Sequence, residues 1–114
     1  MDQLARHKQL VKQIVEEIAA IQGNPNTSLN IQLITDDEHG HYLLYNNQWR
    51  EERRYYGCFL HIGVPADTGR IWIHHDGTDL IIAEKLLENG VSKQDIVLAH
   101  RSPIMRPDTG FAIA

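Results

Sequence analysis

The first 22 residues carry apolar side chains at the spacing of an amphipathic helix. Most residues of the stripe recur every seven positions: Leu4, Val11 and Ile18, then His7, Ile14 and Ile21, with Leu10 and Val15 beside them. This period predicts one helix with a broad apolar face. Asp2 is suited to cap its start, and Gly23 followed by Pro25 predicts its end.

From residue 29 to residue 75 the apolar period falls to two, which is typical of strands. The pattern predicts four strands, at Leu29–Leu33, Tyr42–Tyr45, Arg53–Val64 and Arg70–His75. The polar run Asn46–Gln48 is expected to break the second strand. On the third strand, alternation predicts that Tyr56, Cys58 and Leu60 share an apolar face with Ile62 and Val64.

A second helix and a short strand complete the pattern. Leu80–Leu87 is the apolar body of the helix, with Thr78 or Asp79 as its cap and Asn89-Gly90 as its end. Ile96–Ala99 reads as a buried strand, and a strand–helix–strand unit of this length predicts a parallel pairing. The apolar end of the chain is expected to dock on the domain. The fold class is therefore α+β: one domain, 1–114, in the order α-β-β-β-β-α-β, with a mostly antiparallel four-stranded sheet and a short fifth strand.

Composition and charge then narrow the function. The 114 residues suit one domain. Eleven basic against fifteen acidic side chains give a net charge of −4, which disfavours autonomous, tight binding to duplex DNA. No apolar run is long enough to span a membrane, and the first residues lack the apolar stretch of a signal peptide. A single cysteine, Cys58, indicates a reduced thiol, so we expect a cytoplasmic protein.

Seven histidines raise the question of a metal site. The best-placed candidates are His74, His75 and Asp76, with His61 on the preceding strand. Because neighbouring residues of a strand point to opposite faces, His74 and His75 cannot both bind one ion with His61 unless the strand is bulged. Asp76 falls on the face of His74, so two or three ligands are available at most. No CxxC or HExxH motif supports a site. We expect sheet-face or surface histidines, with no metal and no cofactor.

Residues for catalysis are equally sparse. Cys58 lies in the middle of the longest strand, where burial would raise the pKa of its thiol and make it inert. The carboxylates at Asp36–Glu38 and Glu51-Glu52 fall in polar turns, where water leaves their pKa values ordinary. Neither a GxGxxG motif nor a P-loop is present. A pocket of His61, Trp72 and His74 would be the one foothold for an enzyme, so the prediction is a protein without catalytic residues.

Arginines beside aromatic residues are the remaining candidates for contact with a partner. They form two groups in the sequence: Arg50, Arg53, Arg54 and Tyr55, and then Arg101 and Arg106. Such groups occur on solvated, salt-bridged surfaces, at protein interfaces and on nucleic acids. Glu51 and Glu52 reduce the first group to a net charge of +1, which weakens the nucleic-acid interpretation.

Several motifs follow one another in a fixed order through the C-terminal half. They are Arg53–His61, Gly69–Ile73, Asp76–Ala83, Gly90–Leu98, Ser102-Pro103, Arg106 and Thr109–Ala114. In order and spacing this set resembles the XisI family, the fdxN element excision controlling factor proteins of cyanobacteria. The likeness extends over nearly the whole chain, because the N-terminal helix and the Gln32–Tyr45 hairpin also fit. The ordered set is far more specific than any one motif.

The resemblance implies a role in controlling site-specific excision of a DNA element, the fdxN element, during heterocyst differentiation. Proteins of this kind are accessory factors to a recombinase and are often encoded beside a companion, XisH, which resembles a nuclease-type fold. The family offers no catalytic residues that could be carried over to this chain.

The expected function is therefore a regulatory factor that contacts an XisH-like protein or a recombinase. Two alternatives stay open: an antitoxin-like inhibitor of an XisH-type nuclease, and an accessory protein that binds DNA directly. We also expect a homodimer, because a small domain with apolar surface on a helix often buries it against a second copy.

Overall fold

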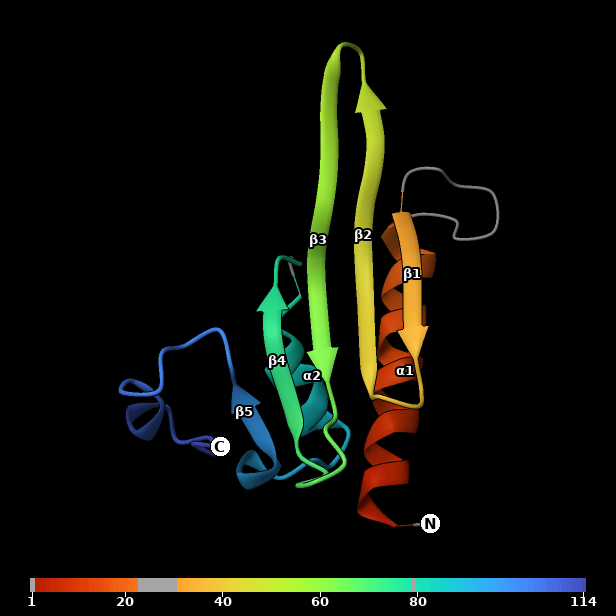
Figure 1. Ribbon diagram of the computed structural model, residues 1–114. Helices are drawn as coiled ribbons and strands as arrows, with labels where there is room; N and C mark the ends of the chain where they lie inside the picture. The colour runs from red at the N-terminus through yellow and green to blue at the C-terminus, as the bar shows by residue number, and fades with distance from the viewer. Residues whose placement is uncertain (1, 23–30, 79) are drawn as a thin grey trace.

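The predicted order of elements is confirmed. The computed structural model describes residues 2–22, 31–78 and 80–114. Its elements are, in order, α1 (Gln3–Gln22), β1 (Ile31–Asp36), β2 (His41–Arg50), β3 (Arg53–Gly63), β4 (Ile71–Asp76), α2 (Ile82–Glu88) and β5 (Ile96–Leu98) (Figure 1). Two short 3-10 turns, η1 (Lys93–Asp95) and η2 (Arg106–Thr109), flank β5. The chain is an α+β domain.

The five strands lie side by side in sequence order. The pairs β1–β2, β2–β3 and β3–β4 are antiparallel. The last pair, β4–β5, is parallel and is connected through α2, as predicted. The sheet is thus mixed rather than purely antiparallel.

Helix α1 forms as its apolar period predicts. The carboxylate of Asp2 accepts a hydrogen bond from the backbone N–H of Ala5 at 2.8 Å, which caps the first turn. Val11, Ile14 and Ile18 are buried against the sheet. The helix ends at Gln22. The predicted stop at Gly23 and Pro25, and the start of the first predicted strand at Leu29, lie outside the described residues.

Both helices pack on one face of the sheet, behind the strands in Figure 1, with α1 against β1 and β2 and α2 against β4. We call this the covered face. Its strand residues are fully buried or nearly so: Tyr42, Leu44, Leu60, Ile62 and Ile73. The opposite face, which we call the open face, carries the residues that alternate with them: His41, Leu43, His61 and Trp72. Among the described residues no helix packs on the open face (Figure 1).

Strands β2 and β3 continue well beyond the rest of the sheet as a two-stranded ribbon (Figure 1). We call residues 46–57 the hairpin arm. The prediction that Asn46–Gln48 break the second strand is wrong, since these residues pair with Tyr55–Gly57 inside one long hairpin. A strand in a two-stranded ribbon has water on both faces, so it does not need the apolar alternation on which the prediction relied. The arm turns tightly at Glu51, whose φ is 57°.

Two β-bulges interrupt the plain alternation. On β3, Leu60 lies opposite Leu44 and Cys58 opposite Tyr45, so Phe59 is the extra residue. The bulge moves the residues before it to the other face. The prediction that Tyr56 and Cys58 share the apolar face of Leu60 is therefore wrong. Tyr56 is 67% exposed and Cys58 is half-buried.

The second bulge lies on β4. Ile73 pairs with Ile62 and His75 pairs with His61, which leaves His74 as the extra residue. The sequence allowed such a bulge only as a condition for bringing the histidines together. Its consequence for the site is described below.

Helix α2 begins later than predicted, at Ile82 rather than Leu80. The cap comes from Asp76 at the end of β4, whose Oδ2 accepts from the backbone N–H of Ile82 at 3.1 Å. Its Oδ1 accepts from the backbone N–H of Thr78 at 3.0 Å. Asp79, the other predicted cap, lies outside the described residues. The helix ends as predicted, with Gly90 in the left-handed region at φ 88°.

The C-terminal segment docks along β5, as its apolar residues predict. The backbone N–H of Ala112 donates to the carbonyl of Ile96 at 2.9 Å, and Ala112 forms a parallel bridge with Val97. Ala112 is buried, and Phe111 packs on the edge of the core. The segment therefore covers the outer edge of β5.

Candidate functional site

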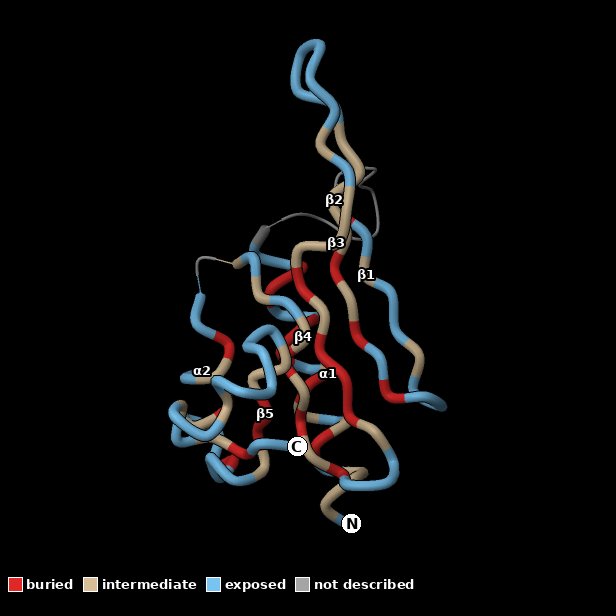
Figure 2. Tube along the Cα trace, turned by 60° about the vertical axis from the view of Figure 1, so that its left-hand side comes forward, coloured by how far each residue is buried: buried red, intermediate tan, exposed pale blue. Residues whose placement is uncertain are grey.

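The structure divides the predicted contact residues between two separate places. Arg50, Arg53, Arg54 and Tyr55 lie at the tip of the hairpin arm. Arg101 and Arg106 follow β5, near the C-terminus, at the opposite end of the molecule in Figures 1 and 2. The two groups do not form one surface, and each is considered on its own terms.

One face of the arm holds an arginine between two exposed aromatic rings. The guanidinium of Arg54 lies 5.5 Å from the ring centre of Trp49 and 4.9 Å from that of Tyr56. Its Nη2 donates to the Oδ1 of Asn47 at 2.6 Å. Trp49 is 64% exposed and Tyr56 is 67% exposed. Cation–π contacts and the hydrogen bond to Asn47 thus hold these side chains in place, although they are exposed to water.

The opposite face of the arm repeats the pairing once. The guanidinium of Arg50 lies 5.1 Å from the ring centre of Tyr55. Glu51 and Glu52 form the turn beside these residues, so three arginines and two glutamates leave the tip with a charge of +1. In Figure 2 the tip of the arm is coloured as exposed. Exposed Trp, Tyr and Arg with little net charge are typical of the centre of protein interfaces.

Arg106 is engaged inside the chain. Its Nε donates to the carbonyl of Arg101 at 3.1 Å, and Nη2 donates to the carbonyl of Ala99 at 3.4 Å. The same guanidinium lies 5.4 Å from the ring centre of Trp72. These contacts hold the C-terminal segment against β4 and β5. Arg101 is exposed.

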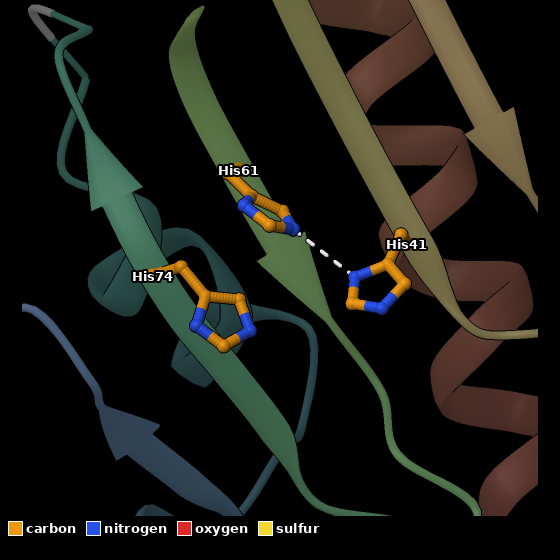
Figure 3. A group of neighbouring side chains, drawn as sticks. All are labelled: His41, His61 and His74. Carbon is orange, nitrogen blue, oxygen red and sulfur yellow. Dashed lines mark hydrogen bonds between the residues drawn. The ribbon is translucent and has the colours of Figure 1, made fainter.

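A second candidate site lies on the open face, where three histidines converge (Figure 3). His41 comes from β2, His61 from β3 and His74 from β4, and one nitrogen of each lies within 4.8 Å of the others. His41 Nδ1 is 3.1 Å from His61 Nε2. The ring centres of His61 and His74 are 4.5 Å apart.

Gly63 leaves the space that this cluster occupies. The strand register places Gly63 between His41 on β2 and Trp72 on β4. A Cβ at this position would lie 2.7 Å from His74 Nε2 and 3.6 Å from His41 Nδ1. A side chain here would therefore push the imidazoles apart. Glycine within a strand commonly marks such a close approach of another group.

The structure brings together part of the histidine set considered from the sequence, and adds one residue. His61 and His74 share the site, whereas His75 is exposed and Asp76 caps α2. Sequence reasoning missed His41. The two-residue turn at Glu51-Glu52 pairs Arg50 with Arg53, but a regular ladder from this turn would pair His41 with Ile62. The extra residue Phe59 shifts the pairing to Gly63, and the sequence pattern did not indicate this shift.

Burial favours the neutral form of two of these imidazoles, His61 and His74. Partial burial lowers the pKa of His61 to about 4, with smaller contributions from the neighbouring charges of His74 and His41. Burial also lowers the pKa of His74, with His41 as the second cause. Both rings are therefore neutral at pH 7. Cys58 behaves as predicted, since burial raises the pKa of its thiol.

A groove of about 300 Å³ lies beside the cluster. It is lined by residues of β2, β3 and β4 and of the turns between β1 and β2 and between β3 and β4: His39, His41, Gly63, Val64, Pro65, Asp67, Thr68, Trp72 and His74. The ring of Trp72 stacks on His74, with centres 6.2 Å apart and planes 28° apart. The groove contains Trp72 and His74 of the pocket considered from the sequence, with His41 in place of His61.

None of the described helices is both long enough and apolar enough to cross a membrane.

Comparisons with known proteins agree with this fold over nearly the full length of the chain. No functionally curated protein matches the chain. A solved structure of a XisI-like protein from Anabaena variabilis ATCC 29413 is 32% identical, covers 97% of this chain and 99% of its own, and superposes with a TM-score of 0.85.

A second solved structure carries a more specific description. It is the fdxN element excision controlling factor XisI from Anabaena variabilis ATCC 29413, at 27% identity and a TM-score of 0.84. The match covers 99% of this chain and 100% of that one. The family model described as XisI protein matches residues 1–113. This chain therefore belongs to the XisI family.

Proposed function

We propose that this protein controls site-specific excision of a DNA element without catalysing it, by contact with a protein partner. The observation that carries the proposal is membership of the XisI family over residues 1–113, together with a solved relative described as an fdxN element excision controlling factor. The net charge of −4 favours a protein partner over duplex DNA as the main contact.

The hairpin arm is the surface that we assign to this contact. Trp49, Arg54 and Tyr56 form an ordered and exposed layer on one of its faces. Aromatic and arginine side chains of this kind contribute most of the binding energy in protein interfaces. The arm extends beyond the domain, so a partner can reach both of its faces (Figure 2). The partner we expect is an XisH-like protein or the recombinase itself.

A binding assay between the purified chain and the XisH-like protein encoded beside it tests the proposal. We expect a stable complex, and Trp49→Ala or Arg54→Ala should weaken it by about 10-fold or more. The control is Ile104→Ala, which removes an 83% exposed apolar side chain from the C-terminal segment. No complex with either the XisH-like protein or the recombinase, or equal binding by the arm variants, would contradict the proposed contact.

Direct DNA binding is a second candidate, and the arrangement of arginine and aromatic rings on the arm favours it. These are the groups that hold phosphates and stack on bases. In this case the chain alone should shift an excision-site duplex. Its affinity should fall steeply with salt, and less steeply after Arg54→Ala.

The homodimer stays a prediction, but its physical basis changes. Most of the apolar stripe of α1 is buried in the domain core, with Val11, Ile14 and Ile18 against the sheet, whereas Ile21 near its end is 74% exposed. Further exposed apolar side chains lie on β1 and on the arm, at Ile34 and Trp49 among others. Sedimentation at micromolar concentration distinguishes one copy from two.

A further inference from the structure

The histidine cluster on the open face has a use that is independent of any partner of the arm. We propose that His41, His61 and His74 bind one divalent transition-metal ion, and that Zn²⁺ fits the set best. Three imidazoles suit zinc, copper and nickel, whereas magnesium and calcium prefer oxygen ligands. The geometry of the three rings, the glycine at position 63 and the bulge in β4 all favour such a site.

The distances between the rings are close to those of a zinc site. A tetrahedral zinc ion with Zn–N bonds of about 2.05 Å holds its ligand nitrogens about 3.3 Å apart. The pair His41 Nδ1 and His61 Nε2 already lies at 3.1 Å. No pair in the set exceeds 4.8 Å. To reach the tetrahedral separation, the most distant pair of ring nitrogens would have to approach by about 1.5 Å at most.

Two local features of the backbone make this convergence possible. The bulge on β4 inserts His74 between the paired residues Ile73 and His75, and bulges commonly redirect a side chain at a functional site. Gly63 then leaves room, because a Cβ there would lie 2.7 Å from His74 Nε2. Both features act on the same ring.

The surroundings give the ion an accessible fourth position. Three protein ligands leave one position of a tetrahedral ion for water or for a small anion. The groove beside His41 and His74 provides the access, and Asp67 and Thr68 on its wall are polar. His61 is not among the residues that line this groove, so the ion would be reached past His41 and His74.

The test is titration of the chelator-treated protein with ZnCl₂ by calorimetry, repeated with Co²⁺, whose visible absorption reports tetrahedral coordination. We expect one ion per chain with micromolar or tighter affinity, and a tetrahedral Co²⁺ spectrum. His41→Ala, His61→Ala and His74→Ala should each lose about 100-fold in affinity. The matched control is His75→Ala, which removes the exposed neighbour of His74 and should leave the affinity unchanged.

Gly63→Ala separates the site from the stability of the fold. The new methyl group meets the end of the His74 side chain, which can move, so the domain should fold while zinc affinity falls about 10-fold or more. Zinc binding weaker than millimolar would overturn the proposal. So would an affinity that His61→Ala, His74→Ala and Gly63→Ala leave unchanged, or one that depends on His75.

Discussion

The two faces of the sheet are built from alternating residues of the same strands, yet they differ in almost every physical property. On the covered face Leu44, Leu60 and Ile62 have no exposed surface and pack against the helices. On the open face His61 and Trp72 are half-buried, and imidazole nitrogens lie among aromatic rings. Stability is therefore concentrated on one face, which leaves the other free to carry groups that bind.

The largest test of this comparison replaces one apolar residue on each face. Ile62→Ala on the covered face removes a fully buried side chain and should lower the free energy of unfolding by about 3 kcal/mol. Leu43→Ala on the open face removes a half-buried side chain and should cost less, about 1 kcal/mol. Urea unfolding measures both. Similar losses for the two variants would contradict the division between the faces.

An intermediate loss in the free energy of unfolding is expected at Asp76, the last residue of β4, which caps α2. Asp76→Ala removes the acceptors of the backbone N–H groups of Thr78 and Ile82 and should cost about 1–2 kcal/mol. Thermal unfolding measures the loss. The control is Glu88→Ala at the exposed end of the same helix, with an expected change below about 0.5 kcal/mol. If Asp76→Ala abolished zinc binding without changing stability, Asp76 would be a ligand rather than a cap.

The smallest effect is expected where α1 meets the β1–β2 turn, outside both faces. Asp37 accepts hydrogen bonds from Lys12 Nζ and from the hydroxyl of Tyr42, each at 2.9 Å. These two bonds, with Lys12 first, hold the pKa of Asp37 below its ordinary value of 3.8. The stabilisation is therefore complete above pH 3.8 and is lost as the pH falls through the lower pKa of the folded protein.

Comparison of wild type with Asp37→Asn by thermal unfolding at several pH values measures this contribution. The variant should be less stable at pH 7 by less than about 1 kcal/mol, because the carboxylate is 57% exposed and water screens the pair. The difference should disappear when the pH is brought well below 3.8. A difference that grew in acid would mean that Asp37 does not stabilise the fold as a carboxylate.

The course of the fold could be predicted from sequence wherever one side of an element is buried. Burial on one side requires apolar residues at a regular spacing, and that spacing identifies the element in the sequence. Examples are Val11 and Ile18 on α1, and Leu60 and Ile62 on β3. The predicted second strand ends too early, at Tyr45 rather than Arg50, because the residues of the hairpin arm are not buried in a core and show no apolar period. Asn46–Gln48 are held in β2 by backbone pairing with β3, which leaves no mark in hydropathy.

The candidate site was less predictable because it depends on register. Single extra residues at Phe59 and at His74 decide which side chains share a face, and a bulge has no fixed sequence signature. His61 and His74 could be considered together from sequence, but their choice over His75 could not be made. Asp76 was assigned to the face of His74 by plain alternation, and its carboxylate instead caps α2.

The C-terminal segment protects one edge of the sheet from pairing with strands of other molecules. An uncovered edge strand offers free amide and carbonyl groups to any other chain, and that invites end-to-end growth of sheets. Here the strand β5 is shielded by residues further along its own chain, through Ala112 and the guanidinium of Arg106. Arg106 therefore helps to keep another chain from pairing with the β5 edge of the sheet.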